Sequence, residues 1–239
     1  TWLFSHNTNR ITRYKVNTST LGFREGYSYD ALFSYPWAGL DPQTGDPQGY
    51  LYKNVSKAWS TIINNDSLEN LIFHGSSMPT YFGSLRNGIS WNKFNLSFNL
   101  IYKFGFFFRR TSVDYISIHN GLLGFTHRDF HNRWQKPGDE NLTHVPSMIY
   151  PLNNSSRQTF YSNSEILVEN GSHIRLQDIA ISYNIISKSN AKVPLKNLRI
   201  YAYLNNLGII WKQNSKNIDV ENEFIPARKS FSLGIEARF

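Results

Sequence analysis

The strongest constraint on the fold is the alternation in residues 94–108, which read "FNLSFNLIYKFGFFF". Every second residue from Phe94 to Phe108 is apolar or aromatic, whereas most of the residues between them are polar or small. A period of two predicts a β-strand with one apolar and one polar face. Strands in soluble proteins are usually about 5–6 residues long, whereas a tilted strand that crosses a bilayer needs about 9–11 residues. The length therefore favours a membrane strand whose apolar face contacts lipid.

The same alternation recurs elsewhere in the chain. It is clear in residues 197–206 and 229–239 and looser in residues 81–91. In residues 172–185 the apolar positions change from even to odd numbers, so we predict a β-bulge near Gln177–Asp178. Two further strands are expected near the start, at residues 1–7 and 30–40.

The connections between these segments have two lengths. Trp91 and Phe94 are joined by a tight turn, whereas residues 16–80 and 109–165 are long and rich in Asn, Ser, Gly, Pro and aromatic residues. Short turns on one side and long extracellular loops on the other are typical of outer-membrane barrels. A β-sandwich with functional loops would show a similar pattern.

Composition narrows the function classes. No run approaches the roughly 18 apolar residues of a spanning helix, but alternating strands would not produce one. Aromatic residues make up 15% of the chain, which suits the aromatic girdles of a membrane barrel and also an aromatic-rich sandwich. The net charge is +8, but the basic residues are scattered, so nucleic-acid binding is not expected. The absence of cysteine excludes disulfides, zinc–thiolate sites and a cysteine nucleophile.

No motif predicts catalysis or a cofactor. The sequence contains no Gly-x-Ser-x-Gly elbow and no phosphate-binding loop. Asp41 and Asp46 flank "DPQTGD", which indicates a turn, with a calcium loop as the less favoured alternative. His127 and His131 have metal-ligand spacing only on a helix and lack a nearby third ligand, so we expect a structural role.

Six segments carry a resemblance to a known family. They read "AGLDPQTGDPQGYL", "HGSSMPTYFGSLRNGISWNKFNLSFNLIYKFG", "RWQKPGDE…VPSM", "ENGSHIRLQDIAISYNI", "LRIYAYLNNLGIIW" and "IPARKSFSLGIEARF". In this order they resemble the SusC/RagA-type TonB-dependent transporters of Bacteroidota outer membranes, over about residues 7–239.

The resemblance implies an all-β fold, in which residues 1–239 are the C-terminal strands of a 22-stranded transmembrane antiparallel barrel. The family's plug domain and TonB box have no counterpart in this chain. The implied function is outer-membrane import of oligosaccharides or oligopeptides. The expected partners are the rest of the barrel and its plug, a SusD-like surface lipoprotein lid, TonB acting through the plug, assembly machinery at the C-terminal strand, and lipid. The resemblance also implies that two transporter–lipoprotein pairs can associate as a dimer. The alternatives are a structural component of a larger outer-membrane assembly and a soluble glycan-binding β-sandwich.

Three sets of candidate residues follow from this reading. Polar residues expected on the lumen wall are Asn95, Asn99, Lys103, Arg199, Tyr201 and Glu236. Aromatic ligand candidates in or near the expected loops are Trp37, Tyr50, Trp59, Tyr81, Phe125, Trp134 and Tyr161, with packing inside the loops or contact with a partner protein as the alternative. Phe239 is expected to be an assembly signal, with an interfacial aromatic anchor as the alternative.

Overall fold

The computed structural model describes residues 1–15, 21–65, 68–121, 127–151, 154–185, 197–223 and 225–238. The chain divides into two compact units. The first, here called the sheet unit, comprises residues 1–8, 79–106 and 170–239. The second, here called the loop unit, comprises residues 9–78 and 107–169, and it contains nearly all of the two long segments expected to be loops.

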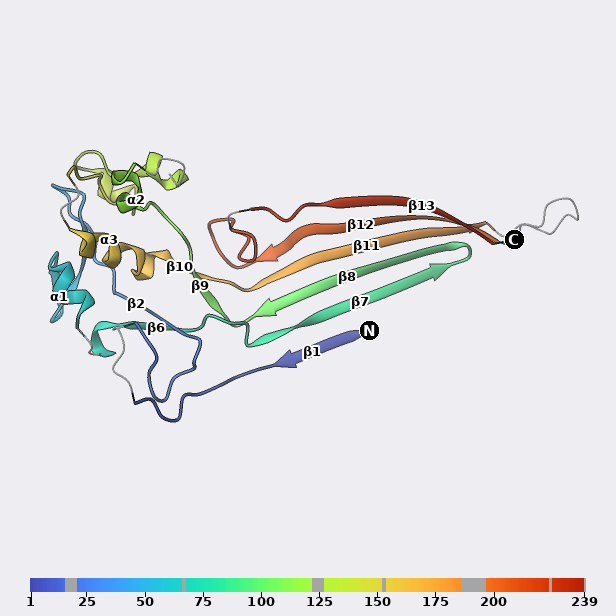
Figure 1. Ribbon diagram of the computed structural model, residues 1–239, viewed down its shortest axis with the longest axis horizontal. Coiled ribbons are helices and arrows are strands. Elements are labelled where there is room, and N and C mark those ends of the chain that lie inside the picture. The colour runs from blue at the N-terminus through green and yellow to red at the C-terminus, as the bar shows by residue number, and fades with distance from the viewer. Residues whose placement is uncertain are drawn as a thin grey trace, which may run out of the picture. The chain divides into compact units, whose positions relative to one another are not determined.

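Long antiparallel strands form the sheet unit (Figure 1). In spatial order they are β1 (Trp2–His6), β7 (Tyr81–Trp91), β8 (Phe94–Phe104), β11 (His173–Ile185), β12 (Asn197–Lys212) and β13 (Ser230–Arg238). Apart from β1, the strands of this sheet have 9 to 16 residues each, which exceeds the usual strand length in soluble proteins. A two-residue turn joins β7 to β8, and Asn92 in this turn has a φ of 54°, which asparagine tolerates better than most residues.

The predicted β-bulge in β11 is confirmed. Leu176 lies opposite Leu100 and Asp178 lies opposite Asn99, so Gln177 is the extra residue. The bulge restores the alternation, because Leu176 and Ile179 then lie on the same face of the sheet.

Three predicted strand limits were wrong. Strand β8 ends at Phe104 instead of Phe108, because Gly105 turns the chain with a φ of 72°. Strand β12 continues to Lys212, beyond the expected end at Asn206. Its register is irregular near Asn206 and Gly208, whose φ angles are 56° and 112°, so the alternation in the sequence does not reveal the continuation. Residues 30–40 form two short strands of the loop unit instead of one long strand.

The register separates the sheet into an apolar and a polar face. One cross-strand row, from β13 to β7, contains Leu233, Ala202, Ile181, Leu96 and Ile89. The adjacent row contains Gly234, Tyr201, Ser182, Asn95 and Ser90. Side chains on the apolar face are uncovered, with Phe231, Leu233 and Ile235 between 61% and 71% exposed. A sandwich would cover this face with a second sheet, so its exposure disfavours the sandwich alternative.

Aromatic residues mark both ends of the apolar face. Trp91, Phe94 and Tyr183 lie in one row near the β7–β8 turn. At the other end the apolar face carries Tyr81, Tyr102, Phe104 and Trp211, and the ring centroids of Phe104 and Trp211 are 5.9 Å apart. Tyr102 lies against Gly83, where a Cβ atom would be 2.5 Å from the tyrosine oxygen, and this hydroxyl donates to the Leu3 carbonyl at 2.6 Å.

Short elements make up the loop unit. They are β2 (Ala31–Ser34), β3 (Gly39–Leu40), β4 (Pro47–Leu51), β5 (Asn54–Ser56), α1 (Trp59–Ile63), η1 (Leu68–Asn70), β6 (Ile72–Ser76), β9 (Phe107–Arg109), α2 (Tyr115–His119), η3 (Arg128–Asn132), η4 (Asp139–Asn141), α3 (Ser155–Ser162), η5 (Glu165–Leu167) and β10 (Val168–Asn170). Side-chain caps start the helices α2 and α3, at Asp114 and Asn154. None of the helices in the described ranges is long and apolar enough to cross a membrane.

The loop unit has a conventional apolar core. One cluster contains Tyr35, Ile62 and Phe160, and another contains Val113, Tyr115 and Val145. Among the described residues, every buried hydrophobic side chain except Phe106 belongs to this unit.

Candidate functional site

The polar face of the long sheet holds the candidate residues for a lumen wall. The register places Asn95, Asn99, Lys103, Arg199, Tyr201 and Glu236 together on this face. Small side chains lie between them, including Gly88, Ser97 and Ala180, and they leave a shallow hollow of about 370 Å³. Tyr201 lies across Gly234, where a Cβ atom would be 2.3 Å from the ring. The face is therefore lined by neutral hydrogen-bonding groups and by paired charges.

Charges near the middle of the polar face compensate one another. Asp178 is buried, accepts a hydrogen bond from Asn99 at 3.2 Å and has the Arg86 guanidinium 3.7 Å away. Near the other end of β12, Arg199 lies 3.8 Å from the Glu236 carboxylate. These pairs leave no uncompensated buried charge at either place.

A denser charged cluster occupies the end of the polar face near residue 103. Its members are Lys103, His173, Arg175, Asp219 and Glu221, which we call the charged cluster. Arg175 donates to Asp219 at 2.6 Å and to Glu221 at 2.8 Å, and Lys103 also pairs with Glu221. Burial would raise the pKa of both carboxyl groups, but the hydrogen bonds from Arg175 and Lys103 outweigh it and hold both values below the usual range.

The acidic members of the charged cluster come from the segment between β12 and β13. Asn214 folds this segment by accepting from the Ile218 amide at 2.9 Å and donating to the Ile218 carbonyl at 3.0 Å. Because Asp219 and Glu221 contact side chains of the polar face, residues 214–222 lie over that face (Figure 1 draws the segment between the two strands).

His173 is the buried centre of the cluster. Its side chain is inaccessible, and Nδ1 lies 2.8 Å from the Gly171 carbonyl, so Nδ1 donates this hydrogen bond. Nε2 has no hydrogen-bond partner and lies 3.9 Å from the Glu221 carboxylate. A buried polar atom without a partner is uncommon and marks this position for attention.

The loop unit takes most of the aromatic ligand candidates into its own packing. Tyr161 is 1% exposed and Trp134 is 8% exposed, so both belong to the interior. Trp37 lies 6.3 Å from the Phe160 ring, and Trp59 donates to the Pro47 carbonyl at 2.7 Å.

The remaining aromatic candidates lie in three different places. Tyr50 is partly exposed on β4. Tyr81 lies on the apolar face of the sheet, where it stacks on His6 at 4.7 Å. Phe125 and the expected assembly signal Phe239 lie outside the described residues.

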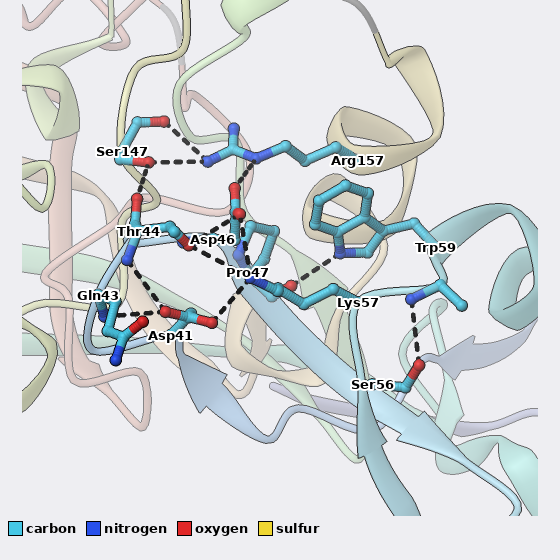
Figure 2. Close-up of polar contacts among 11 residues, drawn as sticks. Asp41, Gln43, Thr44, Asp46, Pro47, Ser56, Lys57, Trp59, Ser147 and Arg157 are labelled. Atoms are coloured by element: carbon cyan, nitrogen blue, oxygen red, sulfur yellow. Dashed lines mark hydrogen bonds and ion pairs between the residues drawn. The ribbon is translucent and has the colours of Figure 1, made fainter.

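Asp41 and Asp46 belong to a polar network inside the loop unit (Figure 2). The Asp41 carboxylate accepts from the amides of Gln43 and Thr44, at 2.8 and 3.0 Å, which closes the turn. The Lys57 ammonium lies 2.8 Å from Asp41 and 3.6 Å from Asp46, at the position between the carboxylates that a calcium ion would need. The Lys57 hydrogen bond also lowers the pKa of Asp41 to about 2. These contacts favour the turn over the calcium loop.

Arg157 connects this turn to two distant segments. Its Nε donates to Asp46 at 2.8 Å, and its Nη2 donates to the Ser147 carbonyl at 2.9 Å. Ser147 in turn donates to the Thr44 carbonyl at 2.7 Å, as Figure 2 shows. The network holds segments more than 100 positions apart in the sequence, so its role is to fix the loop unit.

The two histidines of "HRDFH" flank a short 3₁₀ helix. His127 caps η3, with Nδ1 accepting from the Asp129 amide at 3.1 Å. Asp129 also accepts from Arg110 at 2.6 Å and from Ser112 at 2.8 Å. Within the described ranges, no three His, Cys, Asp or Glu side chains are grouped to hold a metal ion.

Comparisons with known proteins show the fold. No protein-family model matches the sequence, and no curated protein matches it significantly. A structure of the RagAB peptide transporter matches 80% of this chain and 20% of its own, with 21% identity and a TM-score of 0.54. The RagAB peptide importer in the 'open-open' state matches 99% of this chain and 26% of its own, with 19% identity and a TM-score of 0.62. The RagAB peptide importer in the 'closed-closed' state matches 87% of this chain and 23% of its own, with 18% identity and a TM-score of 0.57.

This chain therefore spans between 20% and 26% of the length of those transporter chains. The likeness shows that the chain has a related fold, and the expected all-β fold of antiparallel strands is confirmed.

Sequence reasoning missed the charged cluster and the Arg157 network. Arg175 lies in a strand with alternating apolar and polar residues, and this alternation indicates that its side chain is on the polar face. Its partners Asp219 and Glu221 lie more than 40 positions away in an irregular segment, and no local pattern connects them.

Proposed function

We propose that this chain is a section of the wall of an outer-membrane nutrient importer. The observation that carries the proposal is the inverted arrangement of the sheet unit, with apolar side chains exposed between two aromatic ends. Phe94 and Phe104 are ten positions apart on β8, which corresponds to about 33 Å along the strand. At the tilt of about 40° found in membrane barrels, this span gives a height of about 25 Å, the usual height of the apolar band.

In this proposal the apolar face contacts lipid, and the polar face lines the lumen. The sheet cannot stand alone in a bilayer, because β1 and β13 have free edges whose backbone groups need partners. The rest of a 22-stranded barrel would supply those partners, and a plug would fill the lumen. Phe239 would then be at the periplasmic rim, as an assembly signal or as an interfacial anchor.

The wider role is import of oligosaccharides or oligopeptides in a Bacteroidota-like outer membrane, without catalysis and without a cofactor. The RagAB structures support a transport role through their fold, and their names describe a peptide importer. By the same reasoning, a SusD-like lipoprotein would cover the external side, TonB would act through the plug, and two transporter–lipoprotein pairs could associate. The loop unit would then be extracellular.

Labelling of β8 tests the membrane placement. This chain contains no cysteine, so a cysteine introduced at one of residues 95 to 100 is the only cysteine of this chain that can carry a spin label in the reconstituted transporter. Labels at Leu96, Phe98 and Leu100 should be accessible to oxygen dissolved in lipid, and labels at Asn95, Ser97 and Asn99 should not. An accessibility profile without a period of two would contradict the proposal.

Uptake tests the importer role separately. Deletion of the gene should abolish growth on, or uptake of, a defined oligopeptide or oligosaccharide pool. Unchanged uptake, together with loss of another outer-membrane complex, would favour a structural role in a larger assembly.

A further inference from the structure

The charged cluster has rigid cations and an acidic partner on a connecting segment. Lys103 and Arg175 belong to the central strands β8 and β11, whose register fixes their positions. Asp219 and Glu221 belong to residues 214–222, which contact the face of the sheet without adding a strand to it. The cations thus belong to the strands of the sheet, whereas the carboxylates belong to the segment that connects β12 to β13.

A third cation belongs to the same part of the wall. Lys212 lies opposite His173 in the register, so it is on the same face and next to the cluster. Lys103, Arg175 and Lys212 thus occupy neighbouring positions of one face, and such a group of cations favours an anionic ligand.

The site is also partly dry. Arg175 is 4% exposed, and the neighbouring His173 side chain is inaccessible. Ion pairs are stronger in such an environment than in water, and a planar guanidinium can hold two carboxylates, as Arg175 holds Asp219 and Glu221. A ligand carboxylate could therefore gain the same contacts that Asp219 and Glu221 make now.

We propose that Lys103, Arg175 and Lys212 form a binding site for the carboxylate groups of a ligand, and that Asp219 and Glu221 occupy this site as an internal competitor. An acidic ligand reaching the polar face displaces residues 214–222 and takes their place on Arg175. The ligand class is an oligomer with several carboxylates, which either an acidic oligopeptide or an acidic oligosaccharide provides. This inference rests on the proposed importer, because it takes the polar face as the path of the ligand.

Calorimetric titration of the purified transporter in detergent tests the site. The probes are acetyl-pentaglutamate amide and tetragalacturonic acid, with acetyl-pentaglutamine amide as the neutral control. The double variant Asp219→Asn, Glu221→Gln keeps the shapes of the side chains and removes the competing charges. We expect it to bind one of the acidic probes at least tenfold more tightly than the natural sequence does, with no change for the neutral probe.

A matched control separates the site from general electrostatics. Glu236→Gln removes a carboxylate from the same face, where it pairs with Arg199 at the other end of β12. Its effect on acidic probes should stay below twofold. An equal gain in both variants, or no gain in the double variant with either acidic probe, would overturn the proposal.

Hydrogen exchange in the natural sequence gives a readout that does not depend on any variant. The amides of residues 214–222 should exchange faster when the acidic probe is added, because displacement exposes them. Unchanged exchange at a saturating probe concentration would overturn the displacement. Neither measurement requires transport, so failure here is distinct from failure of the labelling test on β8.

Discussion

Phe160 in the loop unit is completely buried, whereas Leu233 on β13 in the sheet unit is 69% exposed. The loop unit buries apolar and polar side chains, whereas the buried side chains described in the sheet unit are mostly polar, such as His173, Arg175 and Asp178. The loop unit therefore has the burial pattern of a water-soluble domain, whereas the sheet unit has the opposite pattern, which the proposed contact with lipid would explain. Burial in this protein must therefore be judged separately for each unit. An apolar side chain is part of a buried core in the loop unit, whereas an apolar side chain on the sheet is part of an exposed face.

The largest expected effect comes from the apolar core of the loop unit. Phe160→Ala should destabilise this unit by about 3–5 kcal/mol, because it removes a buried ring that packs 5.8 Å from Tyr35. The measurement is hydrogen exchange of the α3 amides in the purified protein. Leu233→Ala is the control, and at an exposed site it should change stability by about 0.5 kcal/mol or less. Equal losses would remove the distinction between the two units.

Ion pairs should show the same distinction. Arg157→Leu should cost about 3 kcal/mol, because it leaves the Asp46 carboxylate in a largely buried site with Lys57, at 3.6 Å, as its nearest cation and the Thr44 hydroxyl as a neutral donor. Arg199→Leu should cost about 0–1 kcal/mol, since its pair with Glu236 is exposed and spans 3.8 Å. Chemical denaturation of both variants measures the difference. A larger cost for Arg199→Leu would show that the loop unit does not depend on its polar network.

The two faces of β8 provide a third test, which addresses the proposed contact of the apolar face with the bilayer. Leu100→Arg should reduce the stability of the membrane-inserted protein by about 2–4 kcal/mol, whereas Asn99→Arg should cost far less. The two residues are neighbours on one strand, so they share depth and differ in face. Urea titration in phospholipid vesicles measures both. Equal costs would contradict the assignment of the apolar face to lipid.

The smallest effect concerns pH and is confined to the loop unit. Lys57 holds the pKa of Asp41 at about 2, which is below its value in an unfolded chain. A depressed pKa stabilises the fold above the unfolded value, and this contribution disappears as pH falls through the folded value. The unfolding free energy should therefore fall between about pH 4 and pH 2, by no more than about 1 kcal/mol for a partly exposed pair.

Asp41→Asn provides the control for the pH effect. This variant should be less stable than the natural sequence at pH 6 and should lose less stability between pH 4 and pH 2. A parallel pH profile in both proteins would assign the acid sensitivity to other carboxyl groups.

The sequence predicted the sheet well because alternation is a local property that strand geometry enforces at every position. It also located the bulge, since the change of phase at Gln177 allows no regular strand. It failed where the chain leaves regular geometry, at Gly105 and Asn206, because a single backbone angle decides the outcome there. The contacts of Arg157 with Asp46 and of Arg175 with Glu221 depend on how distant segments meet, and alternation carries no information about that.

The bulge at Gln177 also has a consequence for how the length of this strand can change in evolution. Removing one residue from a regular strand exchanges its faces on one side of the deletion. Removing Gln177 would instead join Leu176 to Asp178 in simple alternation, so every neighbour would keep its present side. Loss of Gln177 would therefore keep the two faces of β11 and would remove the hydrogen bonds that its side chain donates to Asn205 and Asn206. Loss of Ser182 would instead move apolar side chains to the polar face, so we expect natural shortening of β11 by one residue at position 177 rather than at Ser182.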